Sequence, residues 1–273
     1  MALPVSLALF GICLPAYAQD SNAAEPAAAE QQRIVEAMRK YAEDYVSNLP
    51  NFVCQQVTMQ FEGSKNGKHW HKDDTLTSKL VYNHGREERT LQLVNNKPVR
   101  PNARPRSGTS LSTEGEFGLL LSRVFEPNSE AKFTWVGWET IRGQRVAKFG
   151  YSIDRAHSTL VLTNYIKATV PYHGSIFGDP ANGAIWRATS GTTEIPESLQ
   201  MRSIETTVEY DQVKIGDKNY LLPVSAQVLL ITDKDQVRHE LHFGDYRKFE
   251  AESTITFGGG EESPPTTPQD PKH

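Results

Sequence analysis

His69, His71, Asp73 and Asp74 form the densest group of metal-ligand residue types in the chain. Two histidines at positions i and i+2 of a strand point to the same face, so they could share a metal ion. Their spacing places no third ligand beside them, and the preceding residues 64–68 have the composition of an exposed turn. We therefore interpret the group as a solvated hairpin and predict no metal site and no cofactor.

Asp154, His157 and Ser158 supply the three residue types of a hydrolase triad. A triad is defined by geometry, with a base that an acid orients, and its members come from distant segments. The chain has no Gly-x-Ser-x-Gly elbow. We interpret the three residues as polar positions at the end of a strand and predict that the protein is not an enzyme.

A different set of residues suggests a cavity for an apolar ligand. Its members are four aromatic residues and one histidine of the strand-rich half: Trp135, Tyr151, Tyr172, Trp186 and His239. Aromatic residues also favour strands, so ordinary sheet packing accounts for them nearly as well. A histidine on an apolar strand face is equally typical of a hydrogen-bonded core residue. We predict that these five residues line a ligand cavity and keep core packing as the alternative.

Lys97, Arg100, Arg104 and Arg106 form a basic loop that prolines interrupt. Such a loop could contact anionic head groups or a protein partner. We interpret it as a solvated loop.

The N-terminus has the pattern of a secretory signal peptide. An apolar run over residues 3–15 precedes the small-x-small sequence of residues 16–18, and it is too short for the ~20 residues of a membrane span. The first Lys or Arg is Arg33, so the run lacks a basic flank. We predict cleavage after Ala18 and export to the periplasm or extracellular space. Lipidation at Cys13 or an uncleaved anchor is the alternative.

Composition limits the function classes. The chain has 273 residues and a formal net charge of -4, with acidic and basic residues interspersed. A nucleic-acid binder would concentrate basic residues on one face. Removal of the signal would leave Cys54 as the single cysteine, which excludes an intrachain disulfide; we interpret it as a small buried hydrophobe. No later stretch is apolar enough to span a bilayer.

Hydrophobic periodicity predicts the domain organisation. A flexible leader over residues 19–29 is followed by a single domain over 30–257 and a disordered tail over 258–273. The domain opens with a helix, whose apolar stripe contains Ile34, Met38, Tyr41, Tyr45 and Leu49 and which Pro50 ends.

Strand patterns dominate after this helix. Residues alternate between apolar and polar from Phe52 onward, and short turns connect most of the later strands, which favours antiparallel pairing. A second helix follows the capping pair Thr113 and Glu116. We predict an α+β fold with a curved antiparallel sheet packed against two helices.

Several segments carry a resemblance to a known family. Residues 48–54, 118–120, 172–174, 245–249 and 253–257 resemble an uncharacterised exported protein family of acidobacteria. The resemblance covers most of the mature chain and implies no established activity.

The hairpin over residues 176–187 is also similar to one in the lipoprotein-carrier (LolA-like) superfamily. Asp179 and Gly183 match its aspartate-x-x-x-glycine turn, and Arg187 matches the basic residue that follows. The resemblance implies a half-barrel sheet whose concave apolar face holds acyl chains.

These observations lead to one predicted function and one alternative. We predict a binding protein of the periplasm or envelope that holds a lipid or another hydrophobic ligand. The alternative is a structural or protein-interaction module of the cell envelope, with a filled core and no ligand. Its partners would be other envelope proteins.

Overall fold

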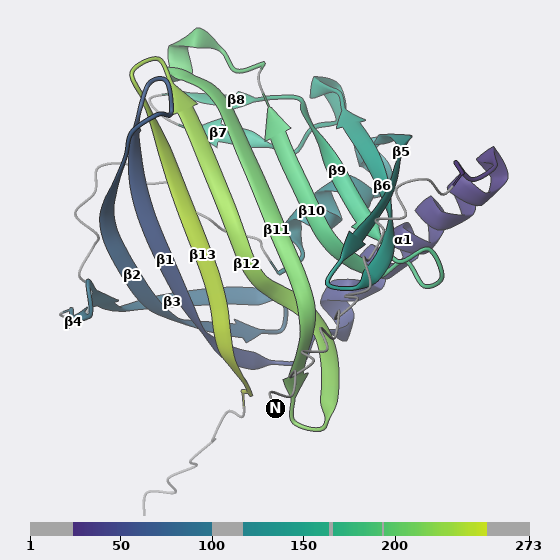
Figure 1. Ribbon diagram of the computed structural model, residues 1–273, viewed down its shortest axis with the longest axis horizontal. Coiled ribbons are helices and arrows are strands. Elements are labelled where there is room, and N and C mark those ends of the chain that lie inside the picture. The colour runs from purple at the N-terminus through teal and green to yellow at the C-terminus, as the bar shows by residue number, and fades with distance from the viewer. Residues whose placement is uncertain (1–23, 100–116, 164–165, 193, 250–273) are drawn as a thin grey trace, which may run out of the picture.

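A long curved β-sheet is the largest feature of the computed structural model, which describes residues 24–99, 117–163, 166–192 and 194–249 (Figure 1). The sheet is antiparallel throughout, in the order β4-β3-β2-β1-β13-β12-β11-β10-β9-β6-β5. Its strands are β1 (Phe52–Ser64), β2 (Trp70–Asn83), β3 (Arg86–Val94), β4 (Lys97–Pro98), β5 (Lys132–Ile141), β6 (Gln144–Ile153), β9 (Tyr172–Gly178), β10 (Ile185–Thr192), β11 (Met201–Ile215), β12 (Lys218–Thr232) and β13 (Asp235–Lys248).

Two helices accompany this sheet: α1 (Ala28–Asn48) and α2 (Leu119–Phe125). The predicted α+β class, with one curved antiparallel sheet and two helices, is confirmed. Neither helix combines the length and apolar character needed to cross a bilayer, among the residues described.

Period-two patterning explains how the strands form and which way they face. In β1, Phe52 and Cys54 are buried on the face that packs against the helices, here called the inner face, and Val53 and Gln55 point to the outer face. Alternate residues of a strand point to opposite faces, so the inner apolar set of the strands creates the main core, and two smaller clusters lie apart from it. The sheet is curved (Figure 1). Buried residues of α1 and α2 join the inner positions of its strands in one cluster.

The strand order depends on one long-range pairing. β1 pairs with β13, the last strand of the sheet, with Phe52 opposite Lys248. The chain crosses from the β4 edge to the β5 edge through the segment that contains α2, and then returns by neighbouring strands. The first and last strands in sequence thus pair in the middle of the sheet.

Helix α1 lies against the inner face through four buried residues, Ile34, Met38, Ala42 and Tyr45. It begins at Ala28, so the last two residues of the predicted leader are helical. Its end at Asn48, two residues before Pro50, agrees with the predicted stop.

Aromatic side chains fill the core beneath α2. Phe52 stacks on Tyr82 at a ring-centroid distance of 5.0 Å, and Phe117 contacts Phe52 at 5.2 Å and Phe243 at 5.3 Å. These contacts join β1, β2 and β13 to Phe117, which lies two residues before α2.

Short elements differ most from the sequence predictions. The second helix begins at Leu119 after Gly118, while its predicted capping pair, Thr113 and Glu116, lies outside the described residues. Two three-residue strands, β7 (Val161–Thr163) and β8 (Lys167–Thr169), form a separate small sheet that the periodicity did not indicate. A run of three residues is too short to display alternation, so such strands depend on tertiary packing. The predicted signal peptide and tail also lie outside the described residues.

Candidate functional site

A pocket of about 440 Å³ lies between α1, the β9–β10 turn and the start of β12. We call it the α1 pocket. Its lining residues are Ala37, Lys40, Tyr41, Asp44, Tyr45, Asn48, Leu49, Ala181, Asn182, Asn219, Tyr220 and Leu221. Its volume falls in the range of small-molecule sites, about 300–1,000 Å³.

The α1 side of the pocket follows from the helical repeat. Ala37, Tyr41, Asp44 and Asn48 are spaced by three or four residues, so they form one stripe along the helix. The apolar stripe of α1 is wider than the area that the sheet covers: Tyr41 is only partly buried and lies in the pocket wall. An apolar surface that the core leaves open is therefore available to another molecule.

The β9–β10 turn forms the second wall, and its geometry brings it against α1. Asp179 accepts hydrogen bonds through Oδ1 from the backbone N–H groups of Ala181 at 2.7 Å and Asn182 at 3.3 Å. Gly183 has φ +74°, and a Cβ at this position would lie 2.1 Å from the carbonyl oxygen of Ala37. Only glycine combines this conformation with so close an approach of two backbones.

A buried hydrogen bond attaches the third wall to the helix. The Tyr45 hydroxyl donates to the backbone carbonyl of Leu221 at 3.0 Å. Burial, together with the neighbouring tyrosines, raises the pKa of Tyr45 well above its usual value, so the hydroxyl stays protonated and remains a donor.

Tyr41 stands beside Tyr45, with a ring-centroid distance of 5.8 Å and an interplanar angle of 40°. Burial raises the pKa of Tyr41 as well. No hydrogen bond joins its hydroxyl to another residue in the described part of the chain. The pocket therefore contains Tyr45, whose hydroxyl is bonded within the chain, and Tyr41 and Tyr220, whose hydroxyls bond to no other described residue.

Charged groups on the pocket rim compensate each other. Lys40 Nζ lies 3.1 Å from Asp44 Oδ2, one helical turn away. The other polar side chains of the lining are the carboxamides of Asn48, Asn182 and Asn219 and the hydroxyls of its three tyrosines. With aromatic and aliphatic walls and a rim without net charge, the α1 pocket can bind an apolar group and hydrogen-bond a polar one.

The residues predicted to line a cavity lie in several environments. Tyr151 and Tyr172 are both buried, with rings 6.2 Å apart, and their hydroxyls donate to the backbone carbonyls of Thr189 and Arg123. Trp135 packs edge-on against Phe149 in the same core.

Trp186 packs against the same core as those three, and His239 lies on another strand, β13. Trp186 follows Ile185 at a bulge in β10 and packs against Phe177. His239 is buried on β13, where its Nε2 lies 3.2 Å from Gln60 Nε2. None of the five predicted residues belongs to the α1 pocket lining. A cavity that all five share stays a prediction.

The structure places the other candidate residues apart from one another. Ser158 donates to the Val170 carbonyl at 2.5 Å, while Asp154 pairs with Lys132 at 2.8 Å and His157 lies 3.4 Å from Glu130. The three residue types of the triad thus have three different partners.

The His–Asp segment forms part of a hairpin, as interpreted. His71 is exposed on β2 opposite Glu62, and Asp74 accepts a hydrogen bond from Asn95 at 2.7 Å. No group of three metal-ligand residues comes together in the described part of the chain. Of the basic loop, Lys97 lies in β4, and Arg100, Arg104 and Arg106 lie outside the described residues.

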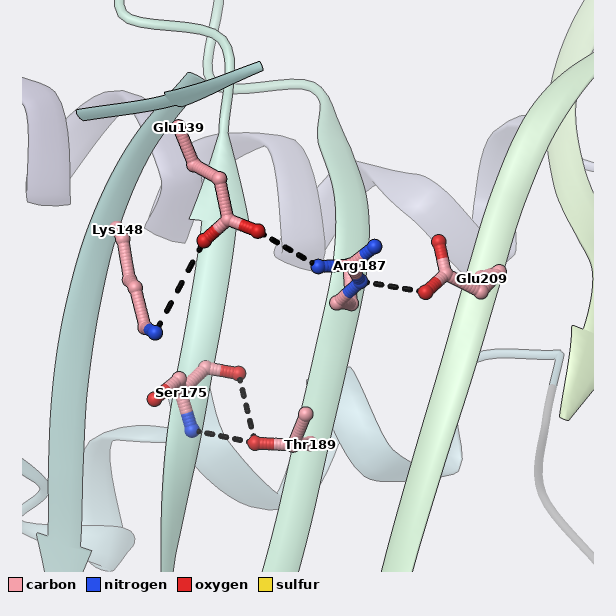
Figure 2. Close-up of polar contacts among 6 residues, drawn as sticks. All are labelled: Glu139, Lys148, Ser175, Arg187, Thr189 and Glu209. Atoms are coloured by element: carbon pink, nitrogen blue, oxygen red, sulfur yellow. Dashed lines mark hydrogen bonds and ion pairs between the residues drawn. The ribbon is translucent and has the colours of Figure 1, made fainter. Parts of the chain in front are cut away.

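A second polar cluster lies on the outer face, on the side of the strands away from the helix (Figure 2). Arg187 on β10 bridges two carboxylates: its Nη1 lies 2.9 Å from Glu139 and its Nε 2.5 Å from Glu209. Lys148 lies 3.9 Å from Glu139, and both cations lie about 5 Å from the ring of Phe177. Because its two acids and two bases compensate each other, we interpret this cluster as a tie between β5, β6, β10 and β11.

Sequence reasoning identified part of the α1 pocket and missed the rest. Tyr41, Tyr45 and Leu49 belong to the predicted apolar stripe of the helix. Asn182, Asn219 and Tyr220 lie in or beside turns, and their sequence contains no sign that they approach α1. The sequence signal for an open site is the width of the apolar stripe on α1, which exceeds the area that one sheet can cover.

Comparison with known proteins identifies fold similarities at low sequence identity. No family model and no curated protein matches the chain. A LolA superfamily protein from Nitrosomonas europaea aligns with 79% of this chain and 93% of its own, at 9% identity and a TM-score of 0.38. A DUF1329 family protein from Desulfovibrio piger aligns with 84% and 96%, at 10% identity and a TM-score of 0.40. The resemblance to an acidobacterial family stays a prediction, and we argue function from the geometry of the site.

Proposed function

We propose that this protein is an exported binding protein that holds an apolar or amphipathic molecule, such as a lipid, in the α1 pocket. The observation that carries the proposal is the uncovered part of the α1 stripe. Tyr41 and Leu49 pack against the edge of the core, remain only partly buried, and line a pocket of about 440 Å³. Large apolar side chains lower the free energy of the system when a ligand removes them from water, by about 25 cal/mol per Å².

The opposite wall supports the same kind of ligand. Tyr220 and Leu221 lie across from the helix, and the Tyr45–Leu221 hydrogen bond holds this wall in place. A pocket that is largely formed before binding loses little free energy to the ordering of its walls. The site of action, the periplasm or extracellular space, rests on the signal-peptide pattern of residues 1–18.

The proposal is tested with the mature chain after removal of co-purified lipid. We expect the environment-sensitive dye 1-N-phenylnaphthylamine to gain fluorescence on binding and a long-chain amphiphile to displace it. The double variant Tyr41→Ser and Tyr220→Ser removes two apolar walls, so the Kd for the dye should rise at least about tenfold, equivalent to ~1.4 kcal/mol.

The matched control is Val136→Ser, which removes an apolar side chain that is 54% exposed on β5, away from the pocket. It should bind the dye as the wild type does. Equal weakening in the control and the double variant, or no binding by the wild type, would contradict the proposal.

An envelope module without a ligand is the second candidate function, and one observation favours it. The inner face beneath α2 is packed with aromatic rings at centroid distances near 5 Å. A core of this kind needs no ligand to complete it. Native mass spectrometry of the protein purified from its own envelope separates the two: bound lipid supports the binding protein, and repeated absence of any adduct supports the module.

A further inference from the structure

We propose that the α1 pocket selects an amphiphile whose polar end is uncharged and donates hydrogen bonds, such as a long-chain alcohol or a monoacylglycerol, over a fatty acid anion. This inference rests on the proposed function and adds the chemical class of the head group. Three features of the pocket support it: the balance of charge, the helix end, and the hydrogen-bonding groups.

The charge on the rim is balanced within α1 itself. Lys40 and Asp44 are the charged residues of the lining, and their side chains pair at 3.1 Å. An anionic head group that recruited Lys40 would have to compete with Asp44 for it. The ammonium group therefore offers a carboxylate little net attraction.

The end of the helix disfavours an anion further. α1 ends at Asn48, and its last turn contains no basic residue. The final carbonyl groups of a helix lack intrahelical partners and carry a partial negative charge. Because Tyr45, Asn48 and Leu49 belong to the lining, this negative end adjoins the pocket. It attracts an O–H or N–H donor and repels a carboxylate.

The hydrogen-bonding groups of the pocket are neutral. Asn48, Asn182 and Asn219 contribute carboxamides, which both donate and accept. The Oδ1 atom of Asn182 already accepts from the backbone N–H of Ala184 at 2.8 Å, which leaves its NH₂ group to donate. A hydroxyl or ester head group satisfies such a set, whereas a charged head group would lose its hydration to partners without compensating charge.

Tyr41 contributes a hydroxyl group to the lining of the pocket. Its hydroxyl has no hydrogen-bond partner in the described part of the chain, and its ring packs beside Tyr45. A site built to hydrogen-bond a hydroxyl discriminates against molecules that lack one, because its own group would stay unpaired. The Tyr41 hydroxyl is therefore placed to recognise the polar end of the ligand.

The test compares ligands with the same chain and different heads. The delipidated mature chain is loaded with 1-N-phenylnaphthylamine at pH 8. The dye is then titrated with monolauroylglycerol, laurate or dodecyltrimethylammonium, each below its micellar concentration. We expect monolauroylglycerol to displace the dye at a concentration about tenfold lower than either charged ligand. If laurate or dodecyltrimethylammonium displaces the dye at an equal or lower concentration than monolauroylglycerol, the inference is overturned and the proposed function stands. If none of the three displaces the dye, the proposed function itself fails.

Variants on the rim separate charge from shape. Asp44→Asn frees the Lys40 ammonium group, so laurate should bind about threefold to tenfold more tightly with monolauroylglycerol little changed. Tyr41→Phe should weaken monolauroylglycerol about fivefold. Asp73→Asn, at an exposed position on β2, makes the same change in overall charge away from the pocket and should change neither affinity. Equal responses of both ligands to Asp44→Asn, or no loss of monolauroylglycerol affinity in Tyr41→Phe, would overturn the inference.

Discussion

The Tyr45 hydroxyl on α1 donates a 3.0 Å hydrogen bond to the backbone carbonyl of Leu221 on β12, across 176 positions of the sequence. The bond is buried, and it links the helix to the strand that forms the opposite wall of the α1 pocket. One contact therefore contributes both to the stability of the fold and to the shape of the site.

Replacement of Tyr45 by Phe should destabilise the protein. The change leaves the Leu221 carbonyl buried without its donor, at a cost of about 1–3 kcal/mol. Urea unfolding followed by circular dichroism measures this difference. Tyr41→Phe is the matched control, since its hydroxyl has no such partner among the described residues, and should change the free energy of unfolding by less than about 0.5 kcal/mol. Equal destabilisation by the two variants would show that the bond contributes nothing.

Two glycines with positive φ predict different costs for the same substitution. Gly216, at the β11–β12 turn, has φ +61° and open space where a Cβ would stand, so Gly216→Ala should cost about 1–2 kcal/mol for the left-handed backbone alone. Gly183→Ala adds a clash with the Ala37 carbonyl, for about 1–3 kcal/mol more. Thermal melts of both variants measure the two losses of stability. Equal stability of Gly183→Ala and Gly216→Ala would contradict the close contact between the β9–β10 turn and α1.

The outer-face cluster predicts a salt-dependent contribution of Arg187. Its side chain is 27% exposed and lies between two carboxylates and a phenyl ring. Arg187→Ala should cost about 1–2 kcal/mol in low salt, because the bridge and the ring contact are both lost. The difference from wild type should shrink in about 1 M NaCl, where charges are screened.

The control for this cluster is Arg202→Ala. Arg202 pairs with Asp233 at a more exposed position, where both side chains are about 60% exposed. We expect no measurable change in its free energy of unfolding. A larger loss at Arg202 than at Arg187 would contradict the interpretation of the cluster as a tie between strands.

His239 predicts a loss of stability toward acid. Burial lowers the pKa of His239 below its ordinary value near 6.5. As the pH falls below about 6.5, His239 takes up a proton in the unfolded chain before it does so in the folded one. The free energy of unfolding therefore decreases. His239→Gln should make this decrease shallower between about pH 6.5 and the lower pKa of the folded state. His71→Gln, at an exposed position, serves as the control; equal slopes in wild type and His239→Gln would disprove the effect.

Cys54 should be unreactive in the folded protein. Burial raises the pKa of its thiol to about 12, and thiol reagents attack the thiolate. The mature chain treated with a thiol-reactive dye at pH 8 should label slowly in buffer and rapidly in concentrated urea. Rapid labelling without denaturant would show that the β1 face is accessible.

Local pattern predicted much of the fold. Alternation in β1 and β11, the helical repeat of α1 and the turn from Asp179 to Gly183 depend on residues close together in sequence, so they could be recognised directly. The pairing of β1 with β13 could not, because it joins the two ends of the domain and many alternative pairings satisfy the same alternation.

The α1 pocket shows the same division. The sequence by itself determined that α1 has a broad apolar stripe, including Tyr41, Tyr45 and Leu49. Tertiary structure decided how much of that stripe the sheet covers and which turns complete the open part, bringing Asn182 and Tyr220 beside the helix. The physical reason is that side-chain periodicity is local, whereas the register between segments as distant as Tyr45 and Leu221 is decided by close packing of the whole inner face.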